Sequence, residues 1–367
     1  MKKSIMGIIV CLLLVGIVGF FLYRNPPKQE ENSKKVETEK KIIEEMTIEE
    51  KVGQLFLVRY DSSLVESYNS KNPGGYILFA KDFENHTKES IKKELDNIQK
   101  ISKYPLIIGV DEEGGYVTRV SRFPAFRKEK FASPKYYFET GGYELLEEME
   151  KEKAELLTSL GINFNLAPVA DVSTSEEDFI YSRSFGRNAE ETADFIKHMV
   201  TYANENHISS CLKHFPGYGN NQDTHTGIAI DNRSYDNFVK NDFLPFEAGI
   251  KAGVPAILVS HNVVTSIDDQ YPASLSEKVI KELRNTLHFN GIIMTDDLEM
   301  DAVKSYVENK EAATLAIKAG NDMIITSNFP SMYEEVIKAV KEKRISEETI
   351  NKAVERILQW KQNSKLF

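Results

Sequence analysis

From residue 42 onward, short apolar runs alternate with longer amphipathic stretches, and this alternation restricts the fold more than any other feature of the sequence. The short runs have the length of strands buried on both faces, and the longer stretches have the spacing of helices. Eight runs follow in order, at residues 54–58, 75–80, 106–110, 163–168, 209–212, 256–260, 291–295 and 322–326. Eight repeats of strand and helix predict an α/β fold of the (β/α)8 barrel type. A doubly wound open sheet would show the same alternation, so the count of eight is what distinguishes the two.

The amphipathic stretches place helices between these runs. Four are expected at residues 87–100, 143–160, 189–206 and 236–252, and two more, at 332–341 and 346–362, follow the last run. Gly161 and Gly253 come directly after two of the stretches, where a glycine commonly ends a helix. These residues therefore predict helix ends as well as helices.

The N-terminal segment differs in composition from the rest. Two lysines precede an apolar run at residues 5–23, which is about long enough to cross a bilayer, where roughly 20 apolar residues are needed. The bulky end of this run offers no small-x-small cleavage site. We therefore expect residues 1–24 to be a single-pass membrane anchor with the rest of the chain outside the cell, or secreted if the leader is cleaved; a buried hydrophobic helix is the alternative. Residues 25–40 are polar and charged, which is typical of a flexible linker, so residues 41–367 form the folded domain.

Net charge and cysteine content exclude two classes of protein. The formal net charge is −10, which argues against a nucleic-acid partner because phosphate binding depends on clustered lysine and arginine. Cys11 lies in the apolar leader and Cys211 in a predicted core strand, so the two cysteines cannot pair within one chain. No disulfide framework is expected.

The loop after the fifth apolar run carries the densest group of chemically active residues. Lys213 and His214 stand at the end of the run, and Asp223 and His225 follow in a stretch broken by glycine and proline. A carboxylate two residues from an imidazole can fix its tautomer and raise its basicity if the loop curls, which makes a proton-transfer pair. The alternatives are a loop whose polar residues satisfy one another and a metal site at His214, His225 and Asp223.

Other predicted strands also end in polar residues, and catalytic residues of a barrel gather at these ends. Asp111 could grip adjacent hydroxyls or pair with Arg119. Asp171 could tie down a loop or touch a ligand, and Arg183 is the better candidate for a ligand contact. His261 could line the pocket or be a satisfied wall residue.

Two adjacent carboxylates end the seventh run, and their surroundings can give them different roles. We expect one of Asp296 and Asp297 to face the barrel mouth as nucleophile or base and the other to cap the following helix. The sequence has no phosphate-binding glycine loop and no His-Glu-x-x-His motif. Carboxylates, arginine and lysine together suit a neutral, polyhydroxylated ligand, and one carboxylate remains for attack, which is the chemistry of sugars.

Read together, these motifs resemble family 3 glycoside hydrolases, and in particular their single-domain β-N-acetylhexosaminidases. The resemblance runs from about residue 42 to the end. It rests on Val-Asp-Glu-Glu-Gly-Gly at 110–115 with Arg119, Ala-Pro-Val at 167–169 with Asp171, Arg-Ser-Phe-Gly at 183–186, Lys-His-Phe-Pro-Gly at 213–217 and Thr-Asp-Asp-Leu-Glu-Met at 295–300.

The resemblance implies a role for each candidate. Asp296 would be the nucleophile that forms a covalent glycosyl-enzyme, with Asp297 as the cap. His225, oriented by Asp223, would protonate the leaving oxygen and later activate water. The sugar hydroxyls would be held by Asp111, Arg119, Arg183, Lys213 and His214.

Three residues or segments depart from the family pattern. Tyr218 stands where a histidine is usual, and the loop at 219–223 is one residue shorter than the common form. Glu112 replaces a glutamine, and we expect a nearby lysine or arginine to answer its charge. The first two departures bear on how the loop closes over substrate.

The resulting expectation is a membrane-anchored, retaining glycosidase that acts as a monomer, without cofactor or metal. It would release terminal β-linked N-acetylglucosamine from oligosaccharides or cell-wall fragments. A β-glucosidase or a β-N-acetylglucosaminide phosphorylase on the same fold is the alternative among enzymes. A non-catalytic sugar-binding barrel is the alternative from another class.

Overall fold

The computed structural model describes residues 41–220, 229–304, 306–307 and 311–366. The chain divides into two units, Met1–Met46 and Thr47–Phe367. In the first unit, residues 41–45 are helical. The predicted anchor at 1–24 and linker at 25–40 lie outside the described residues. Within the described ranges, no helix is both long and apolar enough to cross a membrane.

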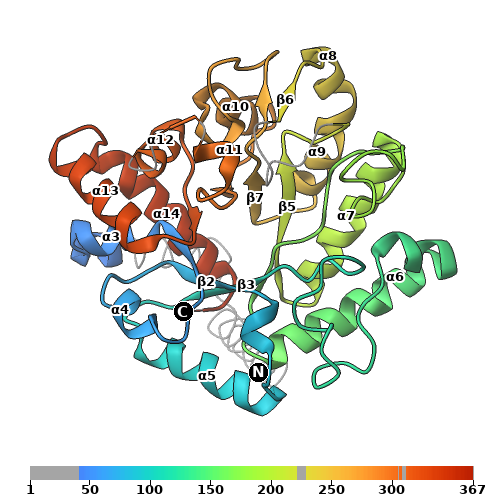
Figure 1. The fold of residues 1–367 in the computed structure, drawn as a ribbon, viewed down its shortest axis with the longest axis horizontal. Coiled ribbons are helices and arrows are strands. Elements are labelled where there is room, and N and C mark those ends of the chain that lie inside the picture. The colour runs from blue at the N-terminus through green and yellow to red at the C-terminus, as the bar shows by residue number, and fades with distance from the viewer. Residues whose placement is uncertain (1–40, 221–228, 305, 308–310, 367) are drawn as a thin grey trace, which may run out of the picture. The chain divides into compact units, whose positions relative to one another are not determined.

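The second unit is built around eight parallel strands in the order β10-β1-β2-β3-β4-β5-β7-β9. A parallel bridge between Met294 and Met323 joins the β9 end of this order to the segment entering β10, so the sheet is a nearly closed barrel (Figure 1). Each predicted apolar run overlaps one strand, which confirms the eight strands of the (β/α)8 expectation, although β1 and β5 extend beyond the ends of their runs. Their bounds are β1 Phe56–Arg59, β2 Gly75–Leu78, β3 Ile107–Val110, β4 Phe164–Asn165, β5 Ser209–Phe215, β7 Ala256–Val259, β9 Ile292–Thr295 and β10 Ile324–Thr326.

Helices surround the strands (Figure 1). The predicted helices are present, and the largest difference in bounds is at the helix expected from residue 143. Helix α6 begins at Pro134 behind the N-cap Ser133 and continues across a kink at Gly141 and Gly142. The α-helices are α3 Ile48–Gln54, α4 Val65–Asn69, α5 Lys88–Ile101, α6 Pro134–Ser159, α7 Ala189–Glu205, α8 Tyr235–Asn237, α9 Phe243–Lys251, α10 Glu277–Lys281, α11 Asp301–Lys304, α12 Ala312–Ala319, α13 Phe329–Lys341 and α14 Glu347–Asn363.

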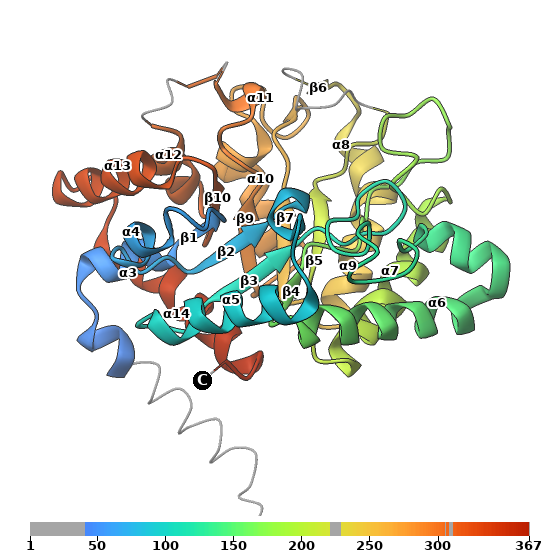
Figure 2. The ribbon, with the colours of Figure 1, turned by 60° about the horizontal axis from the view of Figure 1, so that its bottom comes forward.

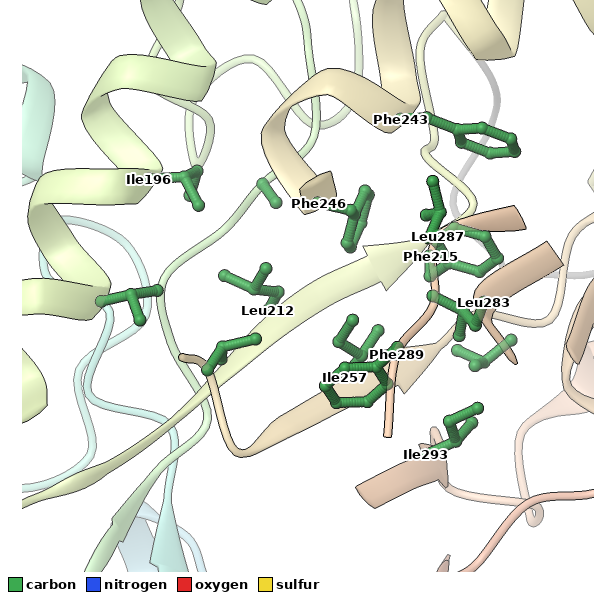
Figure 3. Close-up of a cluster of buried hydrophobic side chains, with 14 of the residues drawn as sticks. Ile196, Leu212, Phe215, Phe243, Phe246, Ile257, Leu283, Leu287, Phe289 and Ile293 are labelled. Atoms are coloured by element: carbon green, nitrogen blue, oxygen red, sulfur yellow. The ribbon is translucent and has the colours of Figure 1, made fainter. Parts of the chain in front are cut away.

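A large apolar cluster fixes β5 against the helices outside it (Figure 3). The Phe215 ring stacks on Phe243 at 5.4 Å between centroids and meets Phe246 edge to face at 5.1 Å. A Cβ added at Gly249 of α9 would lie 2.4 Å from a Leu212 methyl, so α9 can approach β5 closely only with glycine there. This packing holds rigid the strand that carries Lys213 and His214.

A second, two-stranded sheet stands beside the barrel strands and was not predicted. Strand β6, Ile230–Asp231, pairs in parallel with β8, Val263–Val264. In Figure 2, β6 and α11 lie at one end of this unit and α14 at the opposite end. Because β6 follows residues 221–228, this pairing fixes where the chain returns after β5.

A buried lysine on α14 supplies a test of the packing at the opposite end. Lys361 Nζ donates to Gln54 Oε1 at 2.7 Å, and no carboxylate pairs with it in the described part of the chain. Burial lowers the pKa of Lys361 to about 7. An unfolded lysine has a pKa of about 10.4, so between these values the unfolded state binds more protons and stability rises with pH.

We therefore expect the free energy of unfolding of Lys361→Met to exceed that of the parent most at pH 7 and by less at pH 10. Urea unfolding at both pH values measures the difference. The control is Lys352→Met on the same helix, whose exposed amine pairs with Glu348 at 2.7 Å, and whose effect should stay within about 0.5 kcal/mol. A Lys361→Met effect that is equal at both pH values would contradict the burial of a charge.

Candidate active site

The carboxyl ends of the barrel strands open into a pocket of about 520 Å³. Six of the predicted site residues line it, and they come from segments far apart in the sequence: Asp111, Arg119, Arg183, Lys213, His214 and Asp296. The other two, Asp223 and His225, lie outside the described residues. The fold thus brings six candidates into one pocket, and their roles remain predictions.

A charge cluster centred on Glu113 forms one wall of the pocket. Lys213 Nζ lies 2.6 Å from Glu113 Oε1 and 2.7 Å from Asp111 Oδ1. Arg183 donates to both Glu113 oxygens, from Nε at 3.0 Å and from Nη2 at 2.7 Å. The Lys213 and Glu113 side chains are 3% and 4% exposed, so these pairs are largely shielded from water. The sequence had given Glu113 no role, although it stands in a run of three carboxylates.

Glu113 and Lys213 stay charged at neutral pH. Burial alone would raise the pKa of Glu113, but Lys213 and Arg183 together hold it well below its ordinary value. Burial likewise opposes the charge of Lys213, and Asp111 and Glu113 raise its pKa above the ordinary value. Glu113 therefore cannot act as a proton donor, and Lys213 cannot act as a base.

His214 is held by a buried aspartate. Asp171 Oδ2 lies 2.8 Å from His214 Nδ1 and accepts from the His214 backbone N–H at 3.1 Å, while Oδ1 accepts from the Tyr218 N–H at 2.8 Å. Arg183 Nη2 lies 3.3 Å from His214 Nε2, and because a guanidinium only donates, we assign the ring proton to Nδ1. Of the two roles left open for Asp171, it takes the one that ties down the loop.

The two carboxylates after β9 have different surroundings. Both line the pocket, and Asp296 Oδ1 accepts from the Asp297 N–H at 2.8 Å. Asp297 accepts from the Ser327 N–H at 3.2 Å, from the Ser327 hydroxyl and from the Glu299 N–H at 3.0 Å. Helix α11 begins only at Asp301, so the expectation that Asp297 caps it is wrong: its carboxylate closes the preceding turn and ties it to the end of β10.

Glu112 is also engaged differently from the expectation. Its carboxylate accepts from the backbone N–H groups of Arg119 and Val120, both at 2.7 Å, and of Ser121 at 3.3 Å, and from the Ser121 hydroxyl. The expectation of a lysine or arginine partner for Glu112 is wrong, because loop N–H groups supply the donors. Glu112 thereby holds the loop that carries Arg119.

Two aromatic residues lie behind the pocket wall. His261 is fully buried, with Nδ1 2.7 Å from Ser274 Oγ and Nε2 3.0 Å from the Asp297 carbonyl oxygen. It is a satisfied wall residue and does not line the pocket. Tyr218 is also buried and packs edge to face against His214, with ring centroids 5.0 Å apart. The tyrosine therefore backs His214.

Arg59 and Phe79 line the pocket but were missed in the sequence. The Arg59 guanidinium pairs with Asp82 at 2.5 Å and lies 4.2 Å from the centre of the Phe79 ring, while Arg119 lies 5.3 Å from the same ring. Arg59 directly follows the first apolar run, so a reading of every strand end would have found it. Nothing in the sequence distinguishes Phe79 from a core phenylalanine.

Comparison with known proteins identifies the family of this chain. Residues 47–360 match the profile of the glycosyl hydrolase family 3 N-terminal domain. The chain belongs to glycosyl hydrolase family 3. A beta-hexosaminidase of Methylobacillus flagellatus is 31% identical over 274 residues, which cover 73% of this chain and 77% of the relative.

Two solved structures of the family are also similar. A β-N-acetylglucosaminidase from Paenibacillus sp. str. FPU-7 is 28% identical with a TM-score of 0.82. The match covers 88% of this chain but 63% of the Paenibacillus chain, so this chain spans less than two thirds of that protein. A β-N-acetylhexosaminidase from Beutenbergia cavernae is 26% identical with a TM-score of 0.78, and the match covers 87% of this chain and 99% of that one.

Proposed function

We propose that this family 3 hydrolase releases terminal β-linked N-acetylglucosamine with retention of configuration, through a covalent bond to Asp296. The observation that carries the proposal is the position of Asp296, which directly follows β9 and lines the same pocket as Asp111, Glu113 and Lys213. The names of the similar proteins support the choice of an N-acetyl sugar.

The chemistry takes two steps. Asp296 attacks the anomeric carbon, the glycosidic bond breaks, and the leaving oxygen takes a proton from His225. Water then attacks the anomeric carbon and gives a proton to His225. This attack breaks the ester to Asp296 and releases the sugar. The same imidazole thus acts as the acid in the first step and as the base in the second.

The described pocket residues favour a proton donor from outside their own set. Glu113 has a lowered pKa, and His214 has its ring proton directed at Asp171. Burial raises the pKa of Asp297, but its carboxylate accepts three hydrogen bonds from Ser327 and Glu299, which hold it in the turn. The segment at 221–228 begins six residues after the end of β5 and carries Asp223 and His225. It is the natural source of the missing acid.

Sugar binding is assigned to the charged wall. In the part of the chain that the structure describes, the buried Nε of Arg119 has no hydrogen-bond partner, and its Nη2 lies 4.0 Å from Asp111 Oδ2. A ligand hydroxyl between these groups could accept from Arg119 and donate to Asp111. A buried unpaired N–H is costly, so a ligand that satisfies it gains affinity. The pocket volume is in the usual range for small-molecule sites.

The cellular setting is proposed from the sequence alone. Residues 1–24 would anchor the enzyme with residues 41–367 outside the cell. Cell-wall fragments would be the substrates there, and the enzyme would act as a monomer. Protease protection of the C-terminal part in intact cells would contradict this orientation.

The proposed activity is tested with full-length protein in detergent. We expect turnover of 4-nitrophenyl β-N-acetylglucosaminide well above that of the β-glucoside, with free sugar as product whether or not phosphate is present. A preference for the glucoside would indicate a β-glucosidase, and accumulation of a sugar 1-phosphate would indicate a phosphorylase. Binding of N-acetylglucosamine without turnover of either substrate would indicate a sugar-binding barrel.

A further inference from the structure

A buried ion cluster that does not line the pocket lies beneath the chain that leaves β5. Arg233 donates from Nη1 to both Asp242 oxygens at 3.0 and 2.9 Å and from Nε to both Asp231 oxygens at 3.0 Å. Its Nη2 donates to Asp231 Oδ2 at 2.7 Å and to the Gly217 carbonyl at 3.1 Å. The Asp231 and Asp242 side chains are each 1% exposed. We call these three charged residues the Arg233 cluster.

The cluster joins two parts of the chain that flank residues 221–228. On the upstream side, the Gly217 N–H donates to the His214 carbonyl at 2.8 Å, so the carbonyl held by Arg233 belongs to the turn that follows a pocket residue. On the downstream side, Asp231 belongs to β6, where it pairs with Val264 of β8. One guanidinium therefore fixes the departure and the return of this segment.

The backbone upstream of the segment packs directly on the cluster. Gly217 and Gly219 have φ of +123° and +53°, conformations that favour glycine. A Cβ at Gly217 would lie 2.4 Å from Asp242 Oδ1, and one at Gly219 would lie 2.3 Å from Arg233 Nη1. With the cluster in place, the turn can therefore take this path only with glycine at both positions.

Stability alone is a weak reason for such a cluster. Burial raises the pKa of Asp242 to about 7 even though Arg233 opposes the rise. A buried ion group often contributes no more to stability than well-packed apolar side chains, although it can fix one geometry. Arg233 does not line the pocket, so any effect that it has on catalysis passes through the chain that it holds.

We propose that Arg233 is a positioning residue for proton transfer, because it holds Gly217 and Asp231, the described residues on either side of the segment that carries His225. The inference rests on the proposed function, in which His225 is the acid. Arg233 is thus assigned a geometric role in the first chemical step.

Arg233→Lys tests the proposal because a lysine keeps the charge but cannot reach Asp231, Asp242 and the Gly217 carbonyl with one planar fork. The readout is kcat/KM, which reports the glycosyl-transfer step, for two β-N-acetylglucosaminides with a good and a poor leaving group. General acid catalysis contributes about 10²–10⁴-fold, so we expect at least a tenfold fall for the poor leaving group and little change for the good one.

Arg284→Lys is the matched control. Arg284 is similarly buried, with 17% of its side chain exposed against 20% for Arg233, and it pairs with Asp322 at 2.5 Å. It also donates to the Phe289 and Gly291 carbonyls at 2.9 and 2.7 Å and does not line the pocket. A general loss of stability would affect both variants and both substrates alike, whereas a positioning role predicts a leaving-group dependence in Arg233→Lys only.

Three further variants separate the possible failures. If His225→Ala lowers kcat/KM equally for both substrates, the proposed acid is wrong whatever Arg233 does. If His225→Ala lowers kcat/KM mainly for the poor leaving group but Arg233→Lys does not, the inference about Arg233 is overturned. The double variant His225→Ala/Arg233→Lys should be no slower than His225→Ala on the poor leaving group.

If Arg233→Lys does not fold, Asp242→Asn is the substitute. It should lower kcat/KM mainly for the poor leaving group, and an equal loss on both substrates would overturn the positioning role.

Discussion

Asp296→Asn is expected to lower kcat/KM for every aryl β-N-acetylglucosaminide by about 10⁴-fold or more, because a carboxamide cannot form the glycosyl ester. The side chain keeps its size, and its remaining oxygen can still accept from the Asp297 N–H. Good and poor leaving groups should be affected alike, since both need the nucleophile. Near-UV circular dichroism of the variant should match that of the parent.

Asp297→Asn is the matched control for this variant. The two carboxylates are adjacent, but Asp297 is occupied by the Ser327 N–H and hydroxyl and the Glu299 N–H. We expect a much smaller loss of activity and some loss of stability, because an amide can accept at only one of its two polar atoms. If Asp297→Asn were the inactive variant while Asp296→Asn kept turnover, the nucleophile would be Asp297.

Glu113→Gln is expected to impair both stability and activity. It leaves Lys213 and Arg183 without their shared counter-charge in a buried site, and breaking such a pair costs about 3–5 kcal/mol. A 1 Å shift of positioning groups can cost about 10²-fold, so kcat/KM should fall by at least that factor. Urea unfolding and steady-state kinetics measure the two effects.

The loss of stability in Glu113→Gln should depend on pH in a defined direction. The folded-state pKa of Glu113 lies well below the unfolded value of about 4.3, so its carboxylate stabilises the fold fully above that value. The difference between parent and variant should therefore be constant near neutral pH and shrink in acid. Glu139→Gln, at an exposed pair with Arg187 3.4 Å away, is the control and should change stability by less than about 0.5 kcal/mol. Equal effects of both variants would contradict the buried cluster.

The sequence predicted the barrel because its period is visible locally. Each buried strand leaves a short apolar run, and the amphipathic stretches between the runs match the helices. Boundaries failed where tertiary contacts override the local pattern. Strand β5 extends to Phe215 because Lys213 and His214 are accommodated by acidic partners from other segments, Asp111, Glu113 and Asp171.

The site was predictable only as far as motifs and strand ends locate it. The order of the motifs identified six residues that share one pocket, but it could not say which acidic group in the run at 111–113 does what. Glu112 turns to the N–H groups of its own loop, whereas Glu113 meets cations from two other segments. Those partners are 70 or more residues away, so no local pattern distinguishes the two glutamates.

Trapping the glycosyl-enzyme tests the assignment of the nucleophile. A fluorinated N-acetylglucosaminyl fluoride that forms the intermediate quickly and releases it slowly would be incubated with the parent and with Asp296→Asn. Peptide mass spectrometry would then locate the sugar. We predict one added fluoro-N-acetylhexosaminyl group on the parent peptide that contains Asp296, with the fragment ions placing it on that residue, and none on the variant. A sugar on Asp297 or Asp111, or steady turnover without any covalent adduct, would contradict a mechanism through Asp296.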